Sequence, residues 1–315
     1  MKLYLKWFYW YKNFWDEMLF FWLLNYLQKE YSPESFTVEV WNKKRIQHRI
    51  QNNKYYLDKG IIDKLEFVEN AVVSKRFRQI QSLLWLDKYK KYFKVFGWWE
   101  VLDESRNFPH NWWNLFLLHN YSIRKKNFIL VGWIGTDKKK YTKKLYKYLL
   151  PRAKKIICRE EWSVKIAKQY SKNNIVLHKD FSDSALCFVV REGFKPSPTD
   201  KVEKLLQVLI NVWPRYYNNK SIKQIKTFIS KYPKHKKIFF PADINFDKEF
   251  YPKLRKIIPD LEIYDRTKHT LSETIGLFKS CKSWIGSRLH FLYPLKIFKK
   301  DLISISDSDK VKKMI

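Results

Sequence analysis

The alternation of short apolar runs with helical segments is the feature that most constrains how this chain folds. Residues 16–29 carry apolar side chains near three-and-four spacing, which is typical of a buried helix face. Apolar runs of strand length occur at 3–10, 36–40, 65–68, 93–96, 128–134, 155–158 and 175–177. Because helical or polar segments separate most of these runs, the sequence predicts an α/β fold with a mostly parallel sheet.

The same alternation resumes after a break in composition. Residues 193–200, GFKPSPTD, hold one glycine, two prolines and small polar residues, which is typical of a linker. Strands are predicted beyond it at 202–212, 237–240 and 261–264, and helices at 221–231, 247–258 and 272–281. We therefore predict two Rossmann-like domains, 1–195 and 196–315, with a ligand in a cleft between them at the carboxyl ends of the strands.

Several classes of protein are excluded by simple features of the chain. The longest uncharged apolar run, 18–27, is too short to span a membrane, and lysines at 2, 6 and 12 interrupt any signal peptide. A cytoplasmic protein is therefore expected. Cys158, Cys187 and Cys281 lie far apart without a CxxC pair, so we expect buried thiols and neither a disulfide framework nor a bound metal.

The positive charge of the chain has two interpretations. Its 63 Lys and Arg residues against 31 Asp and Glu residues give a net charge of +32, which would attract polyanions. The lysines are spread over the whole length, and Asn, Ile, Tyr and Phe are also abundant, which favours an AT-rich genome and a solvated surface. Peripheral contact with an anionic membrane is a secondary expectation. No specific nucleic-acid partner is expected, because no helix-turn-helix, RNP or zinc signature is present.

The segment WIGSRLH at 284–290 is the strongest candidate for chemistry. The Arg288 guanidinium suits a phosphate or carboxylate, and the His290 imidazole suits proton transfer near neutral pH. If the segment is extended, the two side chains share a face; if it is helical, they diverge. Spacing alone also allows a surface arginine beside a histidine that caps a helix.

Six segments of the chain resemble motifs of the polysaccharide pyruvyl transferases. GSRLHF at 286–291, followed by ISISDSDKVKKMI, resembles the C-terminal signature of that family. NFWDE at 13–17 resembles its opening Asn-Phe-Gly-Asp-Glu loop, and FGWWE at 96–100 resembles its Gly-Gly-Gly-Glu turn. Further matches, in the order of the family, are VGWIG at 131–135, CREEWS at 158–163 and the segment 176–185.

The resemblance implies a fold like the GT-B glycosyltransferases and transfer of a pyruvyl group from phosphoenolpyruvate to a sugar of a cell-surface polysaccharide or its precursor. Phosphoenolpyruvate is the donor substrate, no separate cofactor is implied, and the acceptor is a sugar or a lipid-linked saccharide. Arg288 and His290 are the implied catalytic residues, with His290 as the general acid. The implied substrate-binding residues are Arg159, Gly286, Ser287, Leu289, Asn13, Asp16, Gly97 and Glu100.

Two other functions remain open from the sequence. A GT-B-like glycosyltransferase that uses a nucleotide sugar would fit the same fold, because fold does not settle chemistry. A basic nucleic-acid-binding protein would fit the charge, and its affinity would fall steeply with salt.

Tryptophan stands in this chain where the family has glycine. Trp15, Trp98, Trp99 and Trp133 occupy such turn positions. The 14 tryptophans and 7 glycines together make 21 residues, close to the usual share of glycine alone, about 7%. We therefore favour the hypothesis that UGA codons read as glycine in the source organism appear here as tryptophan. The alternative is a divergent, aromatic-rich protein.

Overall fold

The computed structural model divides into two compact units. Unit 1 comprises Met1–Tyr9 and Met18–Glu192, and unit 2 comprises Trp10–Glu17 and Gly193–Ile315. The structure describes residues 1–6, 14–40, 42–69, 89–97, 102, 120–132, 134–158, 160–172, 174–178, 207–242, 244–288, 291–292, 294, 298 and 300–306, without the side chains of 14–16, 214, 245 and 246. The predicted boundary after residue 195 lies outside these residues.

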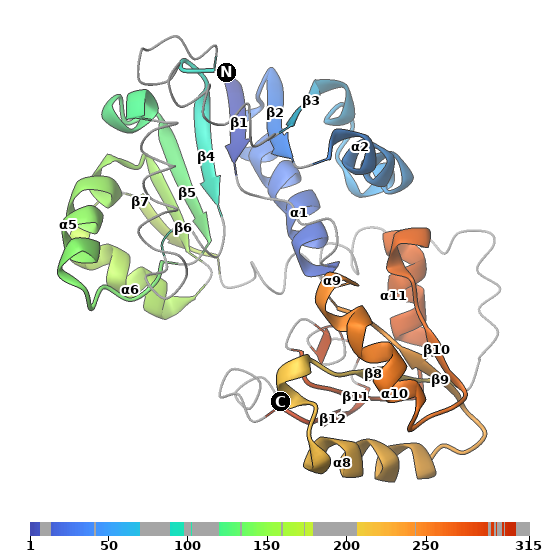
Figure 1. Cartoon of the computed structure of the whole chain (residues 1–315). Coiled ribbons are helices and arrows are strands. Elements are labelled where there is room, and N and C mark those ends of the chain that lie inside the picture. Colours follow the sequence, from blue (N-terminus) through green and yellow to red (C-terminus); the bar gives the residue numbers. More distant parts are fainter. Residues whose placement is uncertain are drawn as a thin grey trace. The chain divides into compact units, whose positions relative to one another are not determined.

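Unit 1 contains a seven-stranded parallel sheet in the order β3-β2-β1-β4-β5-β6-β7 (Figure 1). Its strands are β1 (Lys2–Lys6), β2 (Ser35–Val40), β3 (Leu65–Glu69), β4 (Phe93–Gly97), β5 (Phe128–Gly132), β6 (Lys155–Cys158) and β7 (Asn174–Leu177). Every residue of β4 and β5 is buried, which is typical of a parallel sheet covered on both faces.

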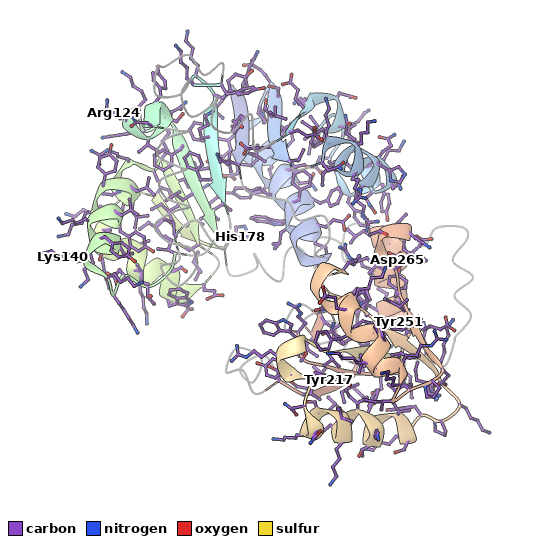
Figure 2. All side chains as sticks on the ribbon, viewed as in Figure 1. Arg124, Lys140, His178, Tyr217, Tyr251 and Asp265 are labelled. Atoms are coloured by element: carbon purple, nitrogen blue, oxygen red, sulfur yellow. The ribbon has the colours of Figure 1, made fainter. Side chains whose placement is uncertain are left out.

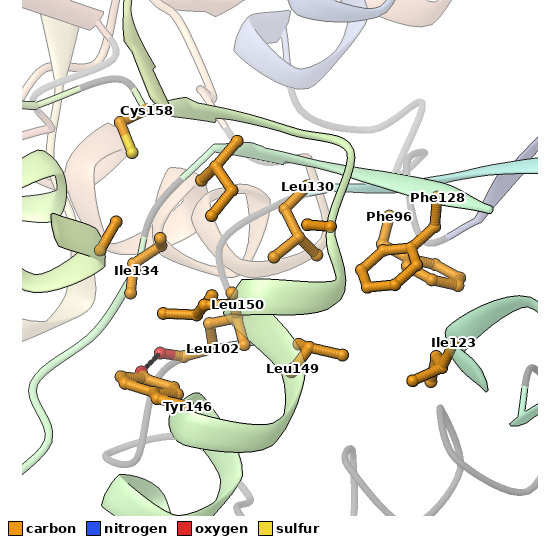
Figure 3. Close-up of a cluster of buried hydrophobic side chains, with 13 residues drawn as sticks. Phe96, Leu102, Ile123, Phe128, Leu130, Ile134, Tyr146, Leu149, Leu150 and Cys158 are labelled. Carbon is orange, nitrogen blue, oxygen red and sulfur yellow. Dashed lines mark hydrogen bonds between the residues drawn. The ribbon is translucent and has the colours of Figure 1, made fainter. Parts of the chain in front are cut away.

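Helices connect the strands of unit 1. They are α1 (Phe14–Tyr31, whose first four residues are counted in unit 2), α2 (Lys43–Asn52), α5 (Lys140–Leu149) and α6 (Glu161–Tyr170). Figure 1 shows α5 and α6 in green beside strands β5 to β7. The side chains of α5 and α6 pack with β4, β5 and β6 in one apolar cluster (Figure 3). The Tyr146 hydroxyl donates a hydrogen bond to the carbonyl oxygen of Leu102 at 2.5 Å and lies 3.1 Å from that of Gly135.

Unit 2 contains a five-stranded parallel sheet in the order β10-β9-β8-β11-β12. Its strands are β8 (Gln207–Asn211), β9 (Lys236–Phe239), β10 (Leu261–Ile263), β11 (Ser283–Gly286) and β12 (Asp301–Ser304), and its helices are α8 (Asn219–Ser230), α9 (Ile244–Asp247), α10 (Tyr251–Arg255) and α11 (Leu271–Ser280). Asn218 caps α8, and Thr270 with Glu273 forms a capping box on α11.

The predicted α/β fold of two Rossmann-like domains is confirmed. The single helix predicted at 247–258 is instead a series of short helical pieces, because α9 ends at Asp247, a 3-10 helix covers Lys248–Phe250 and α10 covers Tyr251–Arg255. Pro252 lies in the first turn of α10, where its missing N–H is tolerated, and a continuous helix would have needed that N–H. Helices α2, α5 and α6 were not predicted as such. In the part of the chain that the structure describes, no helix is both long and apolar enough to cross a membrane.

Candidate functional site

The carboxyl ends of the strands in unit 1 bring four sequence motifs to one edge of the sheet. Strands β1, β4, β5, β6 and β7 are parallel neighbours in that order. The described residues of four motifs, 96–97, 131–132, 158 and 176–178, lie at the carboxyl ends of β4, β5, β6 and β7, whereas the motif at 13–17 starts outside the described residues and is counted in unit 2. The carboxyl edge is where open α/β sheets bind ligands, so the fold groups these motifs where a ligand site is expected.

The order of the strands reverses between β1 and β4. From β1 the chain builds β2 and β3 on one side and then crosses to β4 on the other, which makes this the preferred ligand position in such a sheet. Gly97, a predicted binding residue, is the last residue of β4 and is buried here. Asn13 and Glu100 lie outside the described residues, and Asp16 lies in the first turn of α1 with its side chain outside them.

A buried polar cluster that the sequence did not predict lies at the same switch point. Lys6, the last residue of β1, has its Nζ 3.8 Å from Oε2 of Glu39, and the Tyr4 hydroxyl donates a 2.6 Å hydrogen bond to that oxygen. Tyr4 and Lys6 share a face because side chains alternate along a strand. On β4, Lys94 lies with its Nζ 4.0 Å from the centre of the Tyr4 ring. Such charged side chains are rare inside a parallel sheet.

Arg159, a predicted donor-binding residue, directly follows β6 but lies outside the described residues. Its neighbour Cys158 ends β6 and is buried, and burial raises the pKa of the Cys158 thiol to about 12. The thiol is therefore neutral at pH 7 and does not act as a nucleophile there. Cys158 and Cys281 are buried thiols as predicted, whereas Cys187 lies outside the described residues.

Unit 2 has a switch point of its own between β8 and β11. The chain passes from β8 to β9 and β10 on one side and then crosses to β11 on the other. Asn211 ends β8 and pairs in register with Gly286, which ends β11. The predicted residues Gly286, Ser287 and Arg288 therefore lie at the ligand-binding edge of this sheet.

Asp247, at the end of α9, connects these two strand ends. Its side chain is fully buried, and its Oδ1 accepts hydrogen bonds from Nε of Arg288 at 3.1 Å and from Nη2 of Arg288. Its Oδ2 lies 3.4 Å from Nδ2 of Asn211, which also donates to the carbonyl oxygen of Phe240 at 2.8 Å. Asn211 in turn accepts from the backbone N–H of Arg288 at 3.3 Å. The arginine is thus fixed at both its backbone and its side chain.

The guanidinium of Arg288 keeps one edge available. An arginine side chain has five N–H donors. Two of them, one on Nε and one on Nη2, donate to Asp247. Within the described residues the remaining donors have no acceptor, and 18% of the side chain is exposed. The plane lies near the ring of Trp213, with Cζ 4.7 Å from the ring centre. This arrangement presents a fixed donor edge that matches a phosphate or carboxylate.

Gly286 and Ser287 shape the turn that leads to Arg288. A Cβ on Gly286 would lie 2.5 Å from Cδ1 of Phe291, so the glycine is required by close packing and not by a left-handed backbone. The Ser287 hydroxyl accepts a 2.7 Å hydrogen bond from the backbone N–H of Trp213, which ties the turn to the end of β8. Leu289 and His290 lie outside the described residues, so their roles stay predictions.

Three residues of the site in unit 2 were missed by the sequence: Asn211, Trp213 and Asp247. Asp247 is 41 residues from Arg288, and no local pattern relates them. A further missed residue is Glu17, the last residue of the NFWDE motif, whose Oε2 accepts from Nη1 of Arg266 at 2.7 Å. Both of these residues belong to unit 2 as divided above. Across the described ranges, no group of three or more His, Cys, Asp or Glu side chains is placed to hold a metal ion.

Comparison with known proteins identifies the class of fold. No protein-family model matches the chain, and no curated protein shows significant sequence similarity to it. Among solved structures, it resembles a UDP-GlcNAc 2-epimerase from Neisseria meningitidis bound to UDP-GlcNAc, with TM-score 0.59 and 9% identity over 99% of this chain and 84% of that one. It also resembles the enzyme of the same name from Methanocaldococcus jannaschii, with TM-score 0.58 and 12% identity over 99% and 86%. At this identity the likeness shows the fold alone, that of two Rossmann-like domains of the GT-B type.

Proposed function

We propose that this chain transfers a pyruvyl group from phosphoenolpyruvate to a sugar of a cell-surface polysaccharide or its lipid-linked precursor. The observation that carries the proposal is the Arg288 guanidinium, held on one side by Asp247 and presented at the switch point of unit 2. The ordered motifs at the carboxyl edge of unit 1 support it. The GT-B-type fold, seen in structures of sugar-nucleotide epimerases, agrees with an enzyme of surface-sugar metabolism.

The chemistry would begin with donor binding. Arg288 binds an anionic group of phosphoenolpyruvate, and His290 protonates its C3 methylene, so that C2 becomes an oxocarbenium carbon. A sugar hydroxyl adds to C2 and loses its proton. Phosphate then leaves as the C2–O bond breaks, and a second hydroxyl adds to C2 and loses its proton to close a cyclic ketal. Glu100 or Asp16 accepts a hydroxyl proton in this scheme.

Donor binding can be tested without knowing the acceptor. A ligand that binds only the folded protein raises the thermal midpoint as its concentration exceeds its Kd, with about 2.7 kcal/mol of stabilisation at a hundredfold excess. Phosphoenolpyruvate should therefore protect the protein, and Arg288→Ala should lose this protection through loss of a contact worth about 1.5–3 kcal/mol. Arg255→Ala, in which an exposed arginine of α10 is removed, is the matched control and should keep it.

The role of His290 needs a second readout. His290→Ala should keep thermal protection by phosphoenolpyruvate and lose phosphate release in the presence of a mixed panel of sugar acceptors. Near-normal phosphate release by His290→Ala would show that the general acid lies elsewhere.

A nucleotide-sugar enzyme is the second candidate, and the fold likeness to proteins described as bound to UDP-GlcNAc favours it. The same arginine edge would then bind a diphosphate. Thermal protection by UDP-N-acetylglucosamine but not by phosphoenolpyruvate would select this function over pyruvyl transfer.

A further inference from the structure

Helix α5 of unit 1 carries a one-sided stripe of lysines. Its buried residues Thr142, Tyr146 and Leu149 are spaced four and three apart and face the core of the unit. The opposite side carries exposed lysines at helical spacing, namely Lys140, Lys143, Lys144 and Lys147. Figure 2 shows Lys140 at the outer surface of the unit. We propose that this lysine stripe docks the protein on the surface of an anionic phospholipid membrane.

Among the described residues, the stripe has no counter-charge. None of its four lysines forms a hydrogen bond or an ion pair with any described residue. The sequence from 138 to 159 contains ten lysines and arginines and no Asp or Glu. In contrast, α6 begins with Glu161 and α11 has Glu273 in its first turn. The charge of α5 is therefore available to an external anionic partner.

The lysines of the stripe do not stabilise α5. Lys140 and Lys144, and likewise Lys143 and Lys147, are like charges four residues apart, which weakens a helix. The helix has Lys139 at its N-cap, no side-chain cap and no acidic residue in its first turn, although the helix dipole favours negative charge there. A helix with these costs becomes more stable when its lysines lie against a negatively charged surface.

The composition of the stripe fits a bilayer better than a nucleic acid. Lysine carries its ammonium on a flexible apolar stem that adapts to a fluid headgroup layer, whereas arginine forks and stacked aromatic side chains are the usual means of reading nucleic acid. Tyr141, 41% exposed, lies beside the stripe and has the amphipathic ring that membrane interfaces favour. Each lysine near an anionic leaflet adds to the attraction, which falls off within a Debye length.

The position of α5 in the fold connects the stripe with the carboxyl edge of the sheet in unit 1. Helix α5 follows β5, and the connection starts at the carboxyl end of that strand, the edge at which the motifs of unit 1 are grouped. The start of the stripe therefore lies toward that edge. If the acceptor is lipid-linked, as the proposed function allows, docking through α5 would bring that edge to its substrate. The docking itself does not depend on which donor the protein uses.

The experiment compares two variants of the full chain that lose the same charge. In the first, the α5 lysines are neutralised as K140Q, K143Q, K144Q and K147Q; in the second, exposed lysines of α8 and its C-cap are neutralised as K220Q, K223Q, K226Q and K231Q. Both are sedimented with vesicles of phosphatidylcholine containing phosphatidylglycerol, and with vesicles of phosphatidylcholine alone. A third variant with arginine at the four α5 positions keeps the charge, and circular dichroism confirms the fold of each.

The expected result is salt-sensitive binding of the unaltered protein to the anionic vesicles only. The α5 glutamine variant should bind about a thousandfold more weakly, while the α8 variant and the arginine variant should bind nearly as well as the unaltered protein. Equal losses in the α5 and α8 variants would mean a uniform effect of net charge and would overturn the proposal. So would absent vesicle binding together with α5-dependent binding of a DNA oligonucleotide. Vesicle binding is measured without phosphoenolpyruvate. Its outcome therefore does not depend on whether the protein transfers a pyruvyl group.

Discussion

Oε2 of Glu17 accepts a hydrogen bond from Nη1 of Arg266 across 2.7 Å, although 249 residues separate the two in the chain. Only 4% of the Glu17 side chain and 1% of the Arg266 side chain are exposed. Removing one partner of a buried ion pair is strongly destabilising, by about 3–5 kcal/mol. We therefore expect Arg266→Ala to lower the free energy of unfolding by an amount in this range, measured by urea denaturation.

An exposed ion pair of unit 2 supplies the control for Arg266. Nζ of Lys236 lies 2.7 Å from Oε2 of Glu262, with 44% and 61% of the two side chains exposed. Lys236→Ala should change the free energy of unfolding by no more than about 1 kcal/mol, because water screens the pair. Equal losses in the free energy of unfolding for Arg266→Ala and Lys236→Ala would show that the buried ion pair stabilises the fold no more than the exposed one.

Two glycines of unit 2 predict opposite effects of the same substitution. A Cβ at Gly286 would lie 2.5 Å from the Phe291 ring, so Gly286→Ala should destabilise by about 1–3 kcal/mol and displace the turn that carries Arg288. A Cβ at Gly276, inside α11, meets nothing within 4 Å, so Gly276→Ala should stabilise by about 0.5–1 kcal/mol through helix propensity. Thermal unfolding measures both, and a stabilising Gly286→Ala would contradict the packing argument.

Cys158 should be nearly inert in the folded protein. Burial raises the pKa of its thiol from 9.0 to about 12. The fraction of thiolate at pH 8 is therefore about a thousandfold lower than in the unfolded chain, and iodoacetamide should label this residue correspondingly more slowly than in urea. Site-resolved mass spectrometry separates Cys158 from the other cysteines. Similar labelling rates in the two states would contradict the burial.

The raised pKa of Cys158 also makes the free energy of unfolding depend on pH in the alkaline range. The folded state favours the neutral thiol, so the stabilising contribution is complete below pH 9 and is lost as the pH rises toward about 12. Cys158→Ser should therefore flatten the fall in the free energy of unfolding between these pH values. If Cys158→Ser leaves the slope of the unfolding free energy against pH unchanged, groups other than Cys158 cause the loss of stability at alkaline pH.

The sequence predicted the strand ends of the candidate site better than its side-chain partners. Apolar runs set the strands, and residues after a strand end, such as Arg288, reach the ligand edge whatever the details of packing. Asp247 was not predictable as the partner of Arg288, because a contact across 41 residues depends on which strands are neighbours. The place of Lys6 in the buried polar cluster could not be predicted for a different reason. It lies in an apolar run at 3–10, where hydrophobic pattern alone assigns the whole segment to the core.

The tryptophans give the last prediction. Trp98, Trp99 and Trp133 and the side chain of Trp15 lie outside the described residues, but Gly132, next to Trp133, has φ +118°, a conformation that glycine tolerates. In β11 the buried Trp284 has an indole N–H without an acceptor among the described residues, at a cost of about 1–3 kcal/mol.

Reading the gene should therefore show UGA at Trp15, Trp98, Trp99 and Trp133, and at most of the other ten tryptophans of the 14. Expression of both forms would test the physical consequence. Indoles at turns where the resemblance implies glycine would fill space that a ligand needs, so only the glycine form should be soluble and protected by phosphoenolpyruvate. The structure places Trp15 in the first turn of α1 and not in a turn before it. UGG codons at Trp15, Trp98 and Trp99 would contradict the recoding hypothesis. The tryptophans at these positions would then favour an inactive relative of the enzyme.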